Sequence, residues 1–228
     1  MLRPATALAA LCLSLLGAAA AIPAQPAPPS ALYAAIAASA AARAPYAFDL
    51  DVNSSKINWR THFDPRARPH LTLIDPALAA LGHDQRRAFD EASRRMEGLS
   101  WCASAEMGRI ANVRALRDDA FSTAYAFQPT RDSIRSEAAR PFADHLRGEF
   151  TLIKANPDIV RIHLYAPAPF RAGLLVNLTR IDIVISCEAA PNSRRYASQT
   201  ITEIAGSALG QAFNERTMQR THDLAPAP

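Results

Sequence analysis

The chain has 228 residues, of which 49% are hydrophobic and 20% are charged, and its formal net charge is +4. This length allows one domain with a substantial core. The basic residues are almost all arginines mixed with acidic residues, whereas a nucleic-acid binder typically shows a basic stripe with interleaved aromatic residues. We therefore expect no nucleic-acid partner.

Residues 1–21 are predicted to be a secretory signal peptide. Arg3 supplies a positive charge, an apolar run extends from Ala5 to Leu16, and small residues follow up to Ala21. This order is typical of export signals. The apolar run of about 12 residues is shorter than the roughly 20 that a membrane helix needs. We expect cleavage after Ala21, with a second possible site before Gln25. We also expect no transmembrane segment in the mature protein and a location in a bacterial periplasm or outside the cell.

Residues 22–45 are predicted to lead into the folded domain. The proline-rich segment 22–29 favours an extended conformation. Ser30 is a good N-cap residue, so we expect a helix from there to Arg43. The apolar face of this helix is narrow, which predicts loose docking.

A β-hairpin is predicted directly after this helix. Residues 46–52 and 57–63 alternate between apolar and polar side chains, and the intervening segment 53–56 has the composition of a turn. Such alternation gives a hairpin one apolar face and one polar face. A short third strand is expected at residues 70–74.

The middle of the chain is predicted to contain short helices. Asp75 and Pro76 have the residue types of an N-cap and a first helical position, so we expect a helical turn there. An amphipathic pattern predicts a second helix at about 84–97. A third, at 130–140, is expected to end at Pro141.

Period-two patterning predicts that most of the remaining chain is strand. In residues 173–187 the phase of the alternation slips near Thr179, which predicts a bulge. The other expected strands are residues 112–117, 121–127, 145–155, 159–166, 196–205 and 212–222.

These elements predict an α+β fold with a single β-rich domain over residues 46–228. Roughly ten strands joined mostly by short turns indicate an antiparallel meander. Because the strands are apolar on one side, we expect one curved, half-barrel-like sheet with two or three helices packed on its concave face.

The cysteines predict one disulfide bond. Cys12 lies inside the predicted signal peptide, so Cys102 and Cys187 remain in the mature chain. An even count favours a bridge in an oxidising compartment. The alternative is a pair of separate buried thiols. No second cysteine or histidine stands near either residue at ligand spacing, which disfavours a metal site.

Catalytic motifs are missing from the sequence. We find no glycine-rich phosphate loop, nucleophile elbow or metalloprotease motif. The six histidines are not paired at ligand spacing, so we expect them to be exposed and predict no metal or cofactor.

The most enzyme-like group lies in the predicted hairpin. Asp49 and Asp51 share one face of the first strand, and Arg60 and His62 share a face of the partner strand. Two carboxylates beside a cation can perform acid–base chemistry. The same residues can also form cross-strand ion pairs on a solvated face, and we favour this interpretation.

Several segments resemble a group of uncharacterised exported proteins of Gram-negative bacteria. The resemblance extends from about residue 46 to the C-terminal half of the chain, and the group has no established activity, so it implies no catalytic residue. The matching segments are Phe63–Pro65, Trp101–Cys102, His145–Glu149, Lys154–Pro157, Tyr165–Arg171 and Gly206–Gly210.

The expected sheet is also similar to the half-barrel of periplasmic lipoprotein carriers. That resemblance implies binding of an acyl chain or a hydrophobic partner. We therefore predict a non-enzymatic, envelope-associated periplasmic protein that binds a hydrophobic ligand or a protein partner on the concave side of its sheet. Two alternatives remain: a periplasmic hydrolase using Asp49, Asp51 and His62, and a purely structural envelope protein. The sequence leaves the oligomeric state open.

Overall fold

A computed structural model describes residues 28–42, 44–137 and 139–227. The predicted signal peptide and most of the proline-rich segment lie outside the described residues. Helix α1 covers Ser30–Ala41, with Pro29 rather than Ser30 as its N-cap. Leu32 and Ala35 of α1 are fully buried, so the helix is anchored more firmly than its composition predicts.

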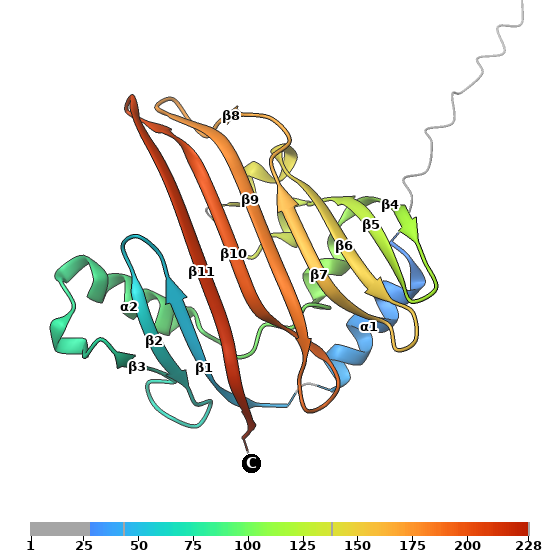
Figure 1. The fold of residues 1–228 in the computed structure, drawn as a ribbon, viewed down its shortest axis with the longest axis horizontal. Coiled ribbons are helices and arrows are strands. Elements are labelled where there is room, and N and C mark those ends of the chain that lie inside the picture. The colour runs from blue at the N-terminus through green and yellow to red at the C-terminus, as the bar shows by residue number, and fades with distance from the viewer. Residues whose placement is uncertain (1–27, 43, 138, 228) are drawn as a thin grey trace, which may run out of the picture.

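Within the described residues, eleven antiparallel strands form one open sheet (Figure 1). Their order is β3-β2-β1-β11-β10-β9-β7-β6-β5-β4, and β8 pairs with β9. This confirms the single antiparallel sheet and the predicted hairpin. The strands are β1 (Tyr46–Asn53), β2 (Asn58–Phe63), β3 (Leu71–Asp75), β4 (Ala111–Asp118), β5 (Ser122–Gln128), β6 (Arg147–Ile153), β7 (Asp158–Tyr165), β8 (Phe170–Arg171), β9 (Val176–Ala189), β10 (Arg195–Ala208) and β11 (Gln211–Pro226).

The first and last strands are neighbours, which a simple meander does not predict. β1 lies between β2 and β11, so Leu50 is paired with Thr61 on one side and with Thr221 on the other. The N-terminal hairpin therefore extends the sheet beyond its C-terminal strand. Residues separated by most of the chain become direct neighbours.

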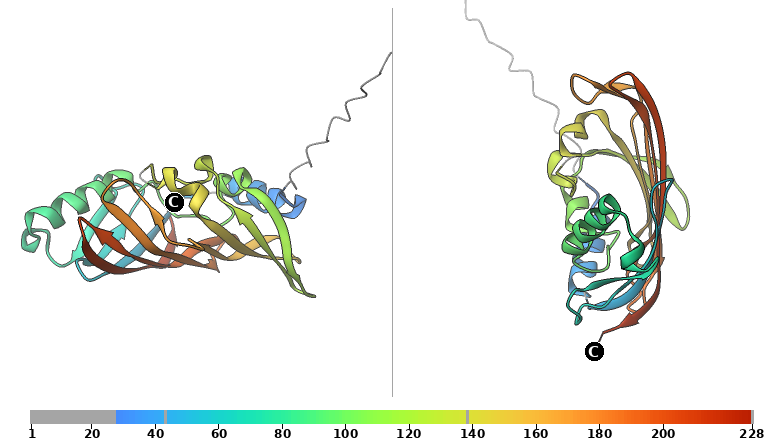
Figure 2. Two further views of the ribbon diagram at one scale, coloured as in Figure 1. Left: turned by 90° about the horizontal axis from the view of Figure 1, so that it is seen from above. Right: turned by 90° about the vertical axis from the view of Figure 1, so that its left-hand side faces the viewer.

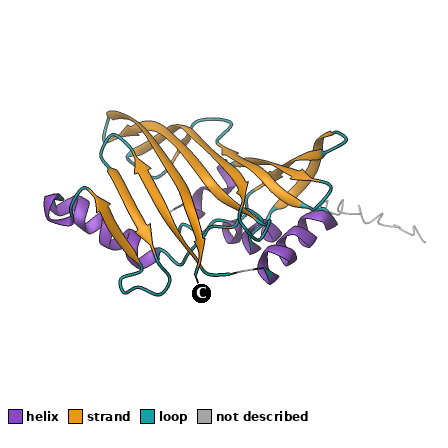
Figure 3. Ribbon diagram, turned by 60° about the horizontal axis from the view of Figure 1, so that its bottom comes forward, coloured by secondary structure: helices purple, strands orange, loops and turns teal. Residues whose placement is uncertain are grey.

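The helical segments lie on one side of a curved sheet (Figure 2). Helix α2 (His83–Arg95) and α1 are near opposite ends of that sheet (Figure 3). The other segments are 3₁₀ helices: η1 (Leu78–Ala80), η2 (Ala105–Arg109), η3 (Arg131–Ser133) and η4 (Arg140–His145). We call the side of the sheet that bears Phe48 and Leu50 the covered face, and the side that bears Asp49 and Asp51 the outer face.

One predicted helix is wrong, and the turn expected after Pro76 forms as η1 with Ala77 rather than Asp75 as its N-cap. Asp75 does not cap a helix, because it pairs with Arg60 and ends β3. The expected helix at 130–140 is replaced by η3 and η4. A capping box between Thr130 and Ser133 closes a single turn, and Pro141 starts η4 instead of ending a helix. Proline is tolerated in the first turn because the amide that it lacks has no helical partner there.

Three apolar clusters fill the covered face. The first packs under α1 and includes Phe150 and Ile159, and the second joins the hairpin to α2 through Trp59 and Phe89. A third, smaller cluster surrounds Phe170. The core is thus distributed along the sheet, because α1 and α2 cover different ends of it.

The structure contains the Cys102–Cys187 disulfide, which joins positions 85 residues apart in the sequence. Cys102 lies in the segment between α2 and η2, and Cys187 is in β9. The adjacent Trp101 forms an isolated bridge with Tyr196 of β10. The bond therefore fixes this irregular segment onto the covered face.

The predicted bulge near Thr179 is confirmed. Arg180 pairs with Ala205 and Leu178 pairs with Gly206, which leaves Thr179 as the extra residue of β9. A Cβ atom at Gly206 would collide with the backbone carbonyl of Asn177. The bulge brings the two strands so close that only glycine fits.

We predict that Gly206→Ala destabilises the fold, because a backbone carbonyl cannot move aside as a flexible side chain can. The free energy of unfolding should fall by about 1–3 kcal/mol, the usual range for overpacking, as measured by urea denaturation. Gly82→Ala is the control, since the added Cβ there meets no atom within 4 Å. Equal destabilisation by the two variants would contradict the close approach at Gly206.

We predict that removing the disulfide with Cys102→Ser and Cys187→Ser lowers the free energy of unfolding by about 2–5 kcal/mol. The bond restricts the unfolded chain by closing a long loop. Denaturant unfolding of the double variant and of the oxidised wild-type protein measures the difference. Reduced wild-type protein is the control and should resemble the variant. If all three proteins unfold at the same denaturant concentration, the bond does not stabilise the fold.

Candidate functional site

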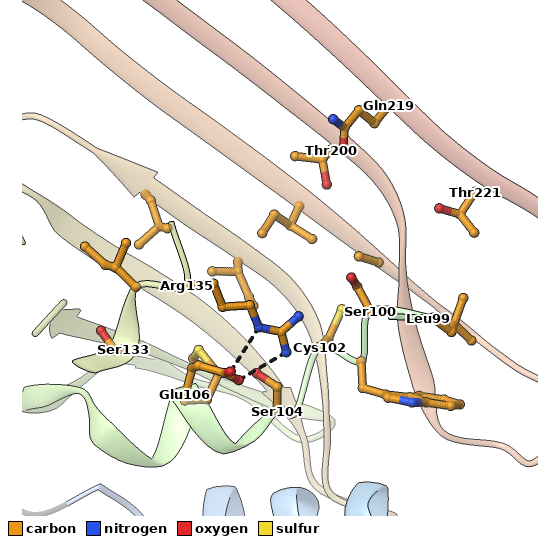
Figure 4. A pocket seen from close by; sticks show the side chains of 18 of the residues that line it. Leu99, Ser100, Cys102, Ser104, Glu106, Ser133, Arg135, Thr200, Gln219 and Thr221 are labelled. Carbon is orange, nitrogen blue, oxygen red and sulfur yellow. Dashed lines mark hydrogen bonds and ion pairs between the residues drawn. The ribbon is translucent and has the colours of Figure 1, made fainter. Parts of the chain in front are cut away.

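A cavity of about 280 Å³ lies on the covered face, between the sheet and two irregular segments. We call these the covering segments, residues 96–110 and 129–135. Strands β1, β5, β7, β9, β10 and β11 form the opposite wall. Figure 4 shows side chains from both walls directed toward the same space. The volume is close to the lower end of the range for small-molecule sites, roughly 300–1,000 Å³.

The position of the cavity follows from the distribution of the helices. The first apolar cluster, under α1, contributes Ile162 and Ile185 to the lining, and the second, beside α2, contributes Phe48 and Leu50. The cavity is therefore at the seam between the two clusters. The middle of the sheet is covered there by irregular chain, which fills space less completely than a packed helix.

Most of the lining is apolar. Aliphatic, aromatic and thioether side chains come from both walls. Removing such apolar surfaces from water lowers the free energy. A site of this kind favours an apolar ligand with a few polar contacts that fix its orientation. The larger apolar residues include Phe48, Leu99, Trp101, Met107, Phe127 and Leu164.

Two charged residues line the cavity, and they neutralise each other. Arg135 donates from Nε and Nη2 to the two carboxylate oxygens of Glu106, at 3.0 and 3.1 Å. These hydrogen bonds lower the pKa of Glu106 to about 2, even though partial burial acts to raise it, and a hydrogen bond from Ser104 lowers it further. The pair joins the two covering segments and leaves the cavity without net charge.

The predicted hydrolase residues lie on the outer face, away from this cavity. The Asp49 carboxylate is 2.6 Å from Nδ1 of His62. Asp51 instead contacts Nε2 of His222 at 3.2 Å. None of Asp49, Asp51 and His62 lines the cavity. The structure therefore pairs Asp49 with His62, as cross-strand reasoning predicts, but joins Asp51 to a residue that the sequence analysis did not select.

The groups that could hold a metal ion are also on the outer face. Asp49, His222 and Asp223 each offer one ligand atom, and these atoms lie within 4.8 Å of one another. Sequence spacing could not reveal this group, because the pairing of β1 with β11 creates it. The same holds for the cavity, whose lining residues come from distant parts of the chain.

No protein family, curated protein or solved structure matches the chain. The resemblances to exported proteins and to lipoprotein carriers therefore stay predictions from the sequence. None of the helices in the described part of the chain is long and apolar enough to cross a lipid bilayer.

We predict that Glu106→Gln destabilises the protein in a pH-dependent way. The pKa of Glu106 is lowered from 4.5 to about 2, so its carboxylate contributes stability above pH 4.5, and that contribution is lost as the pH falls toward 2. At neutral pH the variant should lose at most about 1 kcal/mol, because Arg135 is largely exposed. Urea denaturation at several pH values measures this. A difference that stays constant from neutral pH to the acid limit would contradict the assignment.

Proposed function

We propose that the protein binds a hydrophobic ligand in the covered-face cavity and does not catalyse a reaction. The observation that carries the proposal is the cavity itself, which combines an apolar lining with a self-neutralised ion pair. In this proposal the sheet acts as a half-barrel, and the helices pack on its concave face at either end. The ligand lies between them.

The charge of the lining favours a ligand of a particular chemistry. Arg135 is engaged by Glu106 through both of its hydrogen bonds, so it is not free to hold an anionic group. The remaining polar lining residues are uncharged and include Ser104, Thr200 and Gln219. We therefore propose an apolar chain or ring system, such as one acyl chain, with an uncharged polar end.

The size of the cavity limits the affinity. Each buried methylene contributes about 0.8 kcal/mol. Burying about eight of them gives roughly 6 kcal/mol, a dissociation constant of tens of micromolar. We propose that such a ligand is carried or sensed outside the cytosol, because the Cys102–Cys187 bond is of a kind that forms and persists in oxidising compartments.

Tryptophan fluorescence can report on occupancy. Trp101 lines the cavity, whereas Trp59 packs edge-on against Phe89 in the second apolar cluster. In a Trp59→Phe background the emission comes from Trp101. A medium-chain alcohol serves as the apolar probe. Its binding should shift that emission toward shorter wavelengths, because it displaces water from the indole.

We predict that Thr200→Phe weakens this response by filling part of the cavity. Thr200 lines the cavity from β10, so a larger side chain there occupies the space of the ligand. Binding of the alcohol should weaken at least about tenfold. Thr202→Phe is the matched control, because Thr202 is two residues along the same strand and does not line the cavity.

The control should keep wild-type affinity, with circular dichroism confirming that both variants fold. Wild-type protein that gives no saturable shift would overturn the proposed function. Equal binding by the two threonine variants would place the ligand elsewhere. Native mass spectrometry of protein from its own cells then tests whether a hydrophobic molecule is retained in vivo.

A further inference from the structure

Two histidines and three aspartates meet on the outer face of strands β2, β1 and β11. Asp49 is paired with His62 of β2 on one side and with His222 of β11 on the other. The backbone ladders of two strand pairs therefore place a carboxylate between two imidazoles. Asp51, two residues along β1, lies on the same face and contacts His222.

A bulge in β11 adds a further carboxylate to this group. Ala47 pairs with Ala225 and Asp49 with His222, so Phe48 of β1 is opposed by two residues, Asp223 and Leu224. Asp223 has a positive φ of 53°. The extra residue brings the carboxylate of Asp223 to the ligand atoms of its neighbour His222 and of Asp49. Leu224 then returns to the second apolar cluster.

The bulge matters because strict alternation would direct Asp223 toward the core. Bulges commonly re-aim a side chain, and they are over-represented beside functional sites. Here the result is two consecutive residues with ligand atoms on one face.

The ligand atoms are close enough for one ion. The selected atoms of Asp49, His222 and Asp223 lie within 4.8 Å of one another. Ligands of a tetrahedral zinc ion, bound at about 2.0–2.2 Å, are roughly 3.3 Å apart. Small side-chain rotations therefore suffice, because the paired strands already fix the backbone positions.

We propose that Asp49, His222 and Asp223 bind a divalent transition-metal ion such as Zn²⁺. Mixed imidazole and carboxylate ligands suit this class of ion. His62 acts as a positioning residue, because it hydrogen-bonds the Asp49 carboxylate at 2.6 Å, and such contacts orient ligands. The site is on the opposite side of the sheet from the cavity and does not depend on the proposed function.

His222 lies between two carboxylates. Its two ring nitrogens contact Asp223 at 2.7 Å and Asp51 at 3.2 Å. A metal ion bound at one ring nitrogen would replace one of these contacts and leave the other to orient the imidazole.

Two arginines share the outer face with this group. Arg60 of β2 and Arg220 of β11 are both paired with Asp51. On the β10 side, the residue paired with Arg220 is the uncharged Gln199. The arginines thus lie on the side of Asp51, away from Asp49 and Asp223.

Calorimetric titration of the full mature chain, free of any affinity tag, with Zn²⁺ tests the proposal. We expect one ion per chain with a dissociation constant on the order of micromolar. His222→Ala should weaken binding at least tenfold. His163→Ala is the matched control, because His163 faces Asp182 at 3.3 Å on β7 and β9 but is outside the three-ligand group.

Asp223→Asn keeps the test decisive if His222→Ala does not fold, because the Asp223 side chain is 75% exposed. This variant should also weaken binding at least tenfold. Substituting Co²⁺ should give visible absorption bands that both site variants lose and His163→Ala keeps. Failure of the wild-type chain to bind Zn²⁺, or equal losses in the site variants and the control, would overturn the proposal.

Discussion

The structure depends on the antiparallel pairing of β1 with β11. This ladder extends from the pair Tyr46–Pro226 to the pair Asn53–Met218, and it attaches the N-terminal hairpin to the rest of the sheet. It places the part of the apolar cluster beside α2 that the hairpin supplies next to the strands of the cluster under α1. The cavity lies where these two clusters meet, so the position of the site follows from the pairing of the two strands.

The same register also decides which side chains lie on which face. Successive residues of a strand point to opposite faces, and a slip of one residue exchanges them. Phe48 and Leu50 therefore line the cavity, while Asp49 and Asp51 reach His62 and His222 on the outer face. One register thus produces an apolar site and a polar ligand group back to back. The bulge at Asp223 interrupts this alternation in β11.

Local patterns predicted the parts of the fold that local chemistry controls. Alternation predicted the hairpin, a slip of phase predicted the bulge at Thr179, and the two cysteines that follow the predicted signal peptide predicted the disulfide. The helix expected at 130–140 is absent because a capping box at Thr130 closes a single turn, and a separate turn begins at Arg140. Composition cannot distinguish that outcome from a continuous helix.

Non-local pairing explains what the sequence could not predict. His222 was expected to be an isolated, exposed histidine, because no ligand-type residue stands near it at useful spacing except Asp223. Its other partners, Asp49 and Asp51, lie some 170 residues away in the chain. The cavity was predicted only in general terms, as an uncovered concave surface. Its particular residues, including the Glu106–Arg135 pair, come from segments without regular periodicity.

The covering segments raise the question of why the cavity does not collapse. Ordering irregular chain costs about 1–2 kcal/mol per residue in backbone entropy, and residues 96–104 lack a helix or strand of their own to offset it. Covalent and hydrogen-bonded contacts with the sheet hold this segment in place of regular secondary structure. Cys102 is bonded covalently to Cys187, its amide donates to the Arg195 carbonyl, and Ser100 accepts from the amide of Ala197.

These anchors all lie on β9 and β10, at one edge of the cavity, and the Glu106–Arg135 pair links the covering segments at another. A segment held at two edges can span the space between them without filling it. One of these anchors is covalent, so it constrains the first covering segment more strongly than the hydrogen bonds do, and the cavity edge beside β9 and β10 is the edge most firmly held.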